Sequence, residues 1–174
     1  KDLYKKAEKD FPGDLVIIKR QAILALTEGD MAAANQYIEK YKFILKDNSL
    51  SEAAITTSIA SIYSEAGILN KAEEYYRQLL SIQPENPGRL YNLAYFLIDK
   101  DRNINEGLEL VDKALDSIPD NYSYIDCKGW GLYKQGKNEE ALELLEKSWK
   151  LCPRIYNYAY FHIQEVKKAI GNQK

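Results

Sequence analysis

The residues best suited to chemistry in this sequence are two cysteines, Cys127 and Cys152, and a single histidine, His162. Cys127 and His162 occupy equivalent positions in two successive stretches of helical pattern, so their side chains could be neighbours. A cysteine–histidine pair supports nucleophilic catalysis when an acid orients the histidine and an oxyanion site is present. Asp126 and Glu165 are close in the sequence, but any helical array offers such neighbours by chance. We therefore predict that the chain is not an enzyme.

Other kinds of site find little support in the sequence. Two cysteines without metal-ligand spacing and one histidine argue against zinc, so no metal and no cofactor are predicted. The acidic residues within 139–146 recur at helical spacing beside lysines, which is typical of a solvated helix face. The chain has 24 basic and 26 acidic residues and a net charge of −2, without the basic stripe of a nucleic-acid binder. No apolar run is long enough to cross a bilayer, so neither a nucleic-acid partner nor a transmembrane segment is expected.

An internal repeat organises the chain. Pro84, Pro119 and Pro153 are separated by 35 and then 34 residues. Ala72 and Ala141 each stand twelve residues before one of these prolines, and a glycine precedes each alanine by five residues. A period of this length is typical of repeated pairs of helices that stack on one another.

The repeat resembles the tetratricopeptide repeat (TPR). Residues 122–153 match the TPR pattern almost throughout, and residues 53–86 match most of it. Residues 87–121 also match, with one extra residue in the turn at 101–104 and Gly107 in place of the usual alanine. Residues 15–48 are a weaker copy.

The resemblance implies an all-α fold, an α-α superhelix in which antiparallel helix pairs form a right-handed TPR solenoid. It also implies one TPR domain over residues 1–174. The segments of this domain are then the second helix of a truncated repeat at 1–14, repeats at 15–48, 53–86, 87–121 and 122–155, and a C-terminal capping helix at 156–174.

Small and turn-forming residues have defined places in this register. The sequence predicts that Gly29, Gly67 and Gly136 adopt the left-handed conformation that ends each first helix. Pro84, Pro119 and Pro153 are expected to stop the second helices. Small residues such as Gly129 should let the two helices of a pair approach closely.

The resemblance places the first helix of each pair on a concave surface, where partners bind. In the C-terminal half this surface is rich in aromatic rings, which give a large contact area at little cost in entropy. Some of these rings could instead pack between neighbouring first helices. The predicted partner-binding residues are Tyr91, Asn92, Tyr95, Asp126, Trp130, Tyr133, Phe161 and His162.

A known use of TPR grooves is a clamp of lysine, arginine and asparagine that grips the acidic C-terminus of a chaperone. Of the five matching positions, Lys19 alone carries the required residue, and the other four are occupied by Ile23, Ser58, Gly88 and Asn92. We therefore do not expect a clamp of this kind.

The sequence favours a protein-interaction scaffold that binds a protein or peptide segment. A regulatory or targeting domain of a larger enzyme or signalling protein is the alternative, and a structural spacer is disfavoured by the aromatic residues. Residues 86–97 and 124–130 resemble repeats of bacterial proteins associated with the cell envelope. This resemblance implies a role in envelope assembly or secretion, in the periplasm or as an outer-membrane lipoprotein, with the cytoplasm as the other compartment. The repeat ends could also support self-association.

Overall fold

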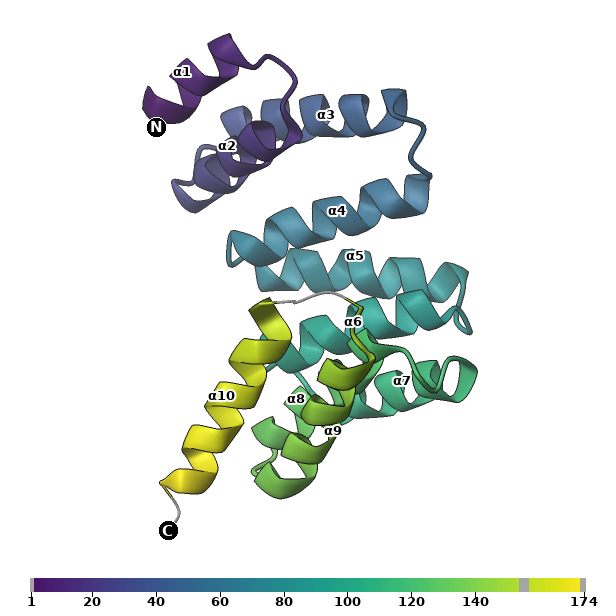
Figure 1. Cartoon of the computed structure of the whole chain (residues 1–174). Helices are drawn as coiled ribbons and strands as arrows, with labels where there is room; N and C mark the ends of the chain where they lie inside the picture. Colours follow the sequence, from purple (N-terminus) through teal and green to yellow (C-terminus); the bar gives the residue numbers. More distant parts are fainter. Residues whose placement is uncertain (1, 154–156, 173–174) are drawn as a thin grey trace. The chain divides into compact units, whose positions relative to one another are not determined.

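The computed structural model describes residues 2–153 and 157–172, and these residues form ten α-helices and no strand (Figure 1). The all-α class expected from the sequence is therefore confirmed. The helices are α1 Asp2–Asp10, α2 Leu15–Thr27, α3 Met31–Asp47, α4 Glu52–Glu65, α5 Leu69–Ile82, α6 Pro87–Asp99, α7 Ile104–Ser117, α8 Tyr122–Lys134, α9 Asn138–Leu151 and α10 Asn157–Gly171. Among the described residues, no helix is both long enough and apolar enough to traverse a bilayer.

Short polar side chains begin most of these helices. An aspartate, asparagine or serine stands before the first residue of α2, α3, α4, α6, α7 and α8, and its side chain accepts a hydrogen bond from an amide of the first turn. Such caps satisfy amides that have no partner within the helix. The cap of α8 is Asn121, which accepts from the amides of Ser123 and Tyr124 at 3.0 and 3.2 Å.

Glycine and proline end the helices as predicted. Gly29, Gly67 and Gly136 have φ values of 76°, 79° and 79°, in the left-handed region that ordinary side chains avoid. In the longer turn between α6 and α7, Asp101 takes this conformation with φ 51°. The helices α5, α7 and α9 each end two residues before a proline, because the residue preceding proline disfavours helical backbone.

The chain divides into two compact units, residues 1–79 and 80–174, and the division falls near the end of α5. In the N-terminal unit, α2 packs on α3 and also contacts α1 and α4. Its buried residues include Ile18 and Ala22 of α2 and Ala34 of α3, which have no exposed surface. Tyr63 of α4 stacks on Tyr75 of α5, with ring centroids 5.7 Å apart.

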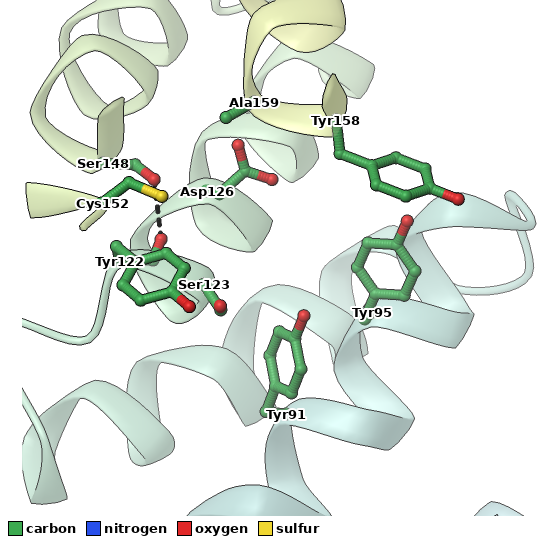
Figure 2. A pocket seen from close by; sticks show the side chains of 9 residues that line it. All are labelled: Tyr91, Tyr95, Tyr122, Ser123, Asp126, Ser148, Cys152, Tyr158 and Ala159. Carbon is green, nitrogen blue, oxygen red and sulfur yellow. Dashed lines mark hydrogen bonds between the residues drawn. The ribbon is translucent and has the colours of Figure 1, made fainter. Parts of the chain in front are cut away.

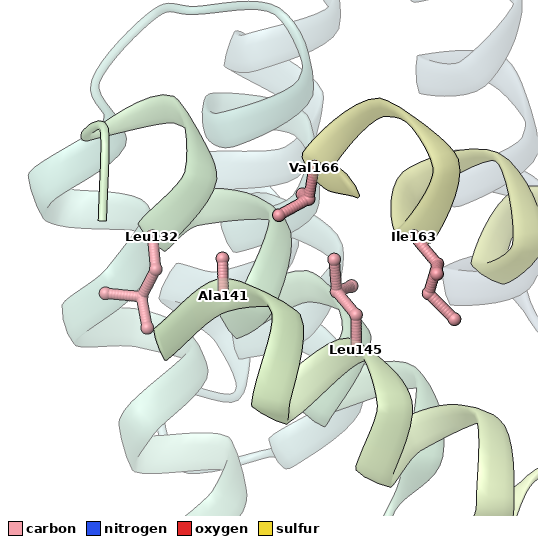
Figure 3. Packing of buried hydrophobic residues seen from close by; sticks show 5 residues of the cluster. All are labelled: Leu132, Ala141, Leu145, Ile163 and Val166. Carbon is pink, nitrogen blue, oxygen red and sulfur yellow. The ribbon is translucent and has the colours of Figure 1, made fainter. Parts of the chain in front are cut away.

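The C-terminal unit consists of the helix pairs α6–α7 and α8–α9, followed by α10, which packs on α9 and α8. Five buried apolar residues from these last three helices form a cluster (Figure 3). They are Leu132, Ala141, Leu145, Ile163 and Val166. The cluster fixes α10 against the preceding pair, and this placement builds the site described next.

Candidate functional site

The C-terminal unit contains a pocket of about 330 Å³ between α6, α8, α9 and α10 (Figure 2). Its lining combines tyrosine rings with a few small polar groups and one carboxylate. The lining residues are Tyr91 and Tyr95 of α6, Tyr122, Ser123 and Asp126 of α8, Ser148 of α9, Cys152 just after α9, and Tyr158 and Ala159 of α10. An apolar pocket with a few polar groups is the usual form of a ligand site, and this volume is at the small end of the range of about 300–1,000 Å³.

Helical spacing explains why α8 contributes three lining residues. Asp126 follows Tyr122 by four residues and Ser123 by three, so its side chain lies on the same face of the helix as theirs. The hydroxyl of Ser148 donates a hydrogen bond of 2.8 Å to the carbonyl oxygen of Tyr122. This bond joins the last turns of α9 to the first turn of α8 and holds that wall of the pocket.

The α6 wall is formed by Tyr91 and Tyr95, whose ring centroids are 6.0 Å apart. The Tyr91 ring is also 5.0 Å from that of Tyr124. In Figure 2 both α6 rings project toward the same space, and Tyr158 extends toward them from α10. Burial raises the pKa of both α6 tyrosines well above the ordinary value near 10, and the negative charge of Asp126 adds to the effect. Their hydroxyls therefore remain protonated and can donate hydrogen bonds.

A second aromatic group lies around Trp130 of α8. The Trp130 ring stacks on that of His162 with centroids 4.1 Å apart and an angle of 13° between the planes. Tyr133 and Phe161 contact the same indole at 4.9 and 6.3 Å. The Lys134 ammonium lies 5.5 Å from the indole centre, a distance that suits a cation–π contact.

Asp126 connects the pocket to this second group. Nδ1 of His162 lies 2.8 Å from Oδ2 of Asp126, and a carboxylate in this position accepts the hydrogen bond from the ring. The His162 side chain is 3% exposed and that of Asp126 is 13% exposed. The other carboxylate oxygen, Oδ1, is buried and has no hydrogen-bond partner among the described residues.

The predicted partner-binding residues are thus not equivalent in their exposure. Tyr91, Tyr95 and Asp126 line the pocket. Trp130 and His162 are buried, with 7% and 2% of their surface exposed, so they support the pocket and offer little surface to a partner. The remaining three residues lie outside the pocket lining: Asn92 and Tyr133 are half-buried, and Phe161 is exposed.

The prediction omitted six residues that line the pocket, namely Tyr122, Ser123, Ser148, Cys152, Tyr158 and Ala159. For Tyr122 and Ser123 a signal existed, because they lie one helical turn before Asp126. Tyr158 belongs to the first-helix face that the TPR register assigns to the concave surface. No comparable signal marks Ser148 and Cys152, since they belong to a second helix and the residue after it.

The structure does not supply the features of a cysteine nucleophile at Cys127. The thiol is completely buried, and this burial raises its pKa well above the ordinary value, with Asp126 and Asp99 adding to the effect. A reactive cysteine requires the opposite shift, toward the thiolate. In the described part of the chain, no three histidine, cysteine, aspartate or glutamate side chains gather as they would around a metal ion.

Comparison with known proteins identifies the repeat. A family model described as tetratricopeptide repeat matches residues 53–86. A TPR repeat-containing protein of Methanocaldococcus jannaschii is 34% identical over 104 residues, which are 60% of this chain and 18% of that protein. The chain therefore corresponds to less than a fifth of the length of this relative.

Solved structures share the fold. The TPR domain of Sgt2 from Aspergillus fumigatus matches with a TM-score of 0.61 and 20% identity, over 72% of this chain and 84% of that domain. The first TPR of Spaghetti, solved with a bound HSP90 peptide, matches with a TM-score of 0.57 and 18% identity, over 69% of this chain and 94% of that structure. Residues 53–86 therefore match a tetratricopeptide repeat, and the chain as a whole shares the fold of TPR domains.

Proposed function

We propose that this chain is a non-catalytic protein-interaction scaffold that binds a peptide or protein segment at the pocket of the C-terminal unit. The observation that carries the proposal is the lining itself, in which four tyrosines and Asp126 from three different helices converge on one space. Tyrosine is enriched at the centres of protein interfaces because a rigid ring contributes much contact area and a polar tip. The first TPR of Spaghetti, which has the same fold, binds an HSP90 peptide.

The exposed ring of Tyr158 would provide the first contact. It is 68% exposed on α10, although it lines the pocket. A ring with this exposure has surface left to bury against a partner, whereas the half-buried Tyr91 and Tyr95 would form the wall behind the bound segment. For the setting, the sequence resemblance to envelope-associated bacterial repeats supports a partner in envelope assembly or secretion.

The test is a selection from a random peptide library, followed by affinity measurements on the selected peptides by fluorescence anisotropy. Tyr158→Ala is expected to weaken binding about tenfold, since truncation of a central aromatic anchor commonly costs more than about 1 kcal/mol. Tyr160→Ala is the matched control. Tyr160 is a 57% exposed tyrosine on the same helix, but its ring packs near Trp149 at 6.4 Å and lies outside the pocket.

Binding that survives both Tyr158→Ala and Tyr95→Ala would place the partner elsewhere and contradict the proposal. A library that yields no peptide with measurable affinity would contradict peptide binding altogether. Circular dichroism of each variant must match the wild type, so that a loss of affinity is not a loss of fold.

A further inference from the structure

The charge that the described lining residues bring to the pocket is negative. Asp126 is its one charged lining residue among those described, and no lysine or arginine side chain reaches the lining. The charges of Asp126 and Asp99 both act on the buried thiol of Cys127, so the negative field extends through this part of α8. The Lys100 ammonium lies 2.9 Å from a carboxylate oxygen of Asp99, but Lys100 is not part of the lining. An occupant with a positive charge would match this field.

The two oxygens of the Asp126 carboxylate are in different environments. Oδ2 is held by His162 at 2.8 Å, while Oδ1 has no partner in the described part of the chain. A buried acceptor without a donor is costly, and the cost is greater when the acceptor carries charge. Asp126 lines the pocket and 13% of its side chain remains exposed, although Oδ1 itself is buried, so a cation that enters the pocket would lie beside the carboxylate.

The walls suit a cation as well. Tyr91, Tyr95 and Tyr158 line the same pocket as Asp126 (Figure 2). The face of an aromatic ring attracts an ammonium group, and aromatic pockets of this kind bind amine cations. Rings can also cover the aliphatic stem of a long basic side chain, whose charged head then extends beyond them.

We propose that the pocket receives a lysine side chain of the bound segment, with its stem between the tyrosine rings and its ammonium group beside the Asp126 carboxylate. This inference rests on the proposed function and specifies the chemistry of the partner. Arginine fits less well. The guanidinium group binds carboxylates most strongly through two parallel hydrogen bonds, and His162 already occupies one of the two oxygens. The ammonium group of lysine is a point charge that needs only one.

The experiment titrates three blocked amino acids into the ¹⁵N-labelled protein and follows its amide resonances. The probes are the N-acetyl methylamides of lysine, of norleucine, which has the same alkyl chain without the charge, and of arginine. The lysine probe is expected to shift the amides of Tyr95, Asp126 and Tyr158 and to bind about tenfold more tightly than the norleucine probe, as a charge-assisted hydrogen bond allows. It should also bind more tightly than the arginine probe.

Two variants show which pocket residues cause the preference for the lysine probe. Asp126→Asn is expected to make lysine and norleucine bind equally, whereas Tyr158→Ala should weaken all three probes together. If Asp126→Asn does not fold, the comparison of probes on the wild type still decides the outcome. Equal binding of norleucine and lysine, tighter binding of arginine, or no shift with lysine would each overturn the inference.

The two proposals fail in different ways. Library peptides that depend on Tyr158 but contain no lysine would leave the interaction site in place and remove the lysine preference. Library peptides whose affinity does not depend on Tyr158 would contradict the proposed binding site itself.

Discussion

At the scale of single residues, the hydrogen bond between Asp126 and His162 has a consequence for binding. The His162 ring is held by its stack on Trp130, and it fixes Oδ2 of Asp126 at 2.8 Å. The carboxylate is therefore oriented before any partner arrives, and little freedom remains to be lost when one binds. At the proposed site, buried Trp130 and His162 would thus contribute to recognition indirectly, by positioning the Asp126 carboxylate.

The buried thiol of Cys127 gives the first prediction for the isolated protein. Its pKa is raised in the folded state, so between about pH 8.5 and its folded pKa the unfolded chain binds fewer protons than the folded one. Stability that is fully present below about pH 8.5 is therefore lost as the pH rises, by up to about 1.4 kcal/mol per pH unit from this group. Urea unfolding curves recorded from pH 7 to pH 10 would measure the slope.

The variant Cys127→Ala tests whether this thiol causes the pH dependence of stability. The variant is expected to be less stable at pH 7, because it leaves a small cavity, but it should lose less stability between pH 8.5 and pH 10 than the wild type. A slope that is unchanged in the variant would mean that another group causes it. Above pH 10 the tyrosines contribute in the same direction, since burial raises the pKa of Tyr76 to about 12.

At the scale of helices, Gly107 shows how closely a pair can pack. A Cβ atom at this position of α7 would lie 2.6 Å from Cγ1 of Ile98 and 3.0 Å from the carbonyl oxygen of Ala94, both on α6. The usual TPR alanine is therefore excluded because Ile98 occupies its space. Gly107→Ala is expected to destabilise the chain by about 1–2 kcal/mol, because the overpacking exceeds the gain of up to about 1 kcal/mol in helix propensity. Urea denaturation measures the difference.

Two controls separate packing from propensity. At Gly171 in α10, an added Cβ atom meets no other atom within 4 Å, so Gly171→Ala should be neutral or slightly stabilising. In an Ile98→Ala background, Gly107→Ala should lose most of its cost, and a double-mutant cycle would report this coupling. A cost that persists without the Ile98 side chain would show that the contact with Ile98 is not its cause.

Much of this helix-level description could be predicted from the sequence, because it depends on local chemistry. Gly29 and Gly136 were expected to be left-handed, and the helices before Pro84 and Pro119 end as predicted. These outcomes depend on backbone sterics within a few residues. The close approach of two helices at the small residue Gly129 was also predicted, and a Cβ atom there would lie 2.9 Å from Cγ of Leu145.

The candidate site was predictable only in part, because it depends on how separate helices meet. The register indicates which face of α8 carries Asp126 and Trp130, but not that His162 of α10 covers the indole. Nor does it indicate that the end of α9 approaches the start of α8, which brings Ser148 and Cys152 to the pocket. Contacts between elements are set by packing of the whole unit, and a helical period carries no information about them.

At the scale of the whole molecule, each of the two units has its own buried core. Ile18 is completely buried in the N-terminal unit and Leu145 in the C-terminal unit. In repeat proteins each helix pair contacts only its neighbours, so stability adds up locally and parts of the chain can unfold separately. Both tryptophans, Trp130 and Trp149, belong to the C-terminal unit. Their fluorescence therefore reports on that unit, whereas far-UV circular dichroism reports on all helices.

We expect urea unfolding followed by these two signals to give transitions that do not coincide, since coincidence requires a single cooperative unit. Ile18→Ala should cost about 2–5 kcal/mol in the N-terminal unit, lowering the midpoint of part of the dichroism change while the tryptophan midpoint stays in place. Leu145→Ala should instead lower the tryptophan midpoint. If the wild-type transitions coincide and Ile18→Ala shifts both signals equally, the two units unfold as one. The bound segment would then stabilise the whole chain and not only the unit that holds its pocket.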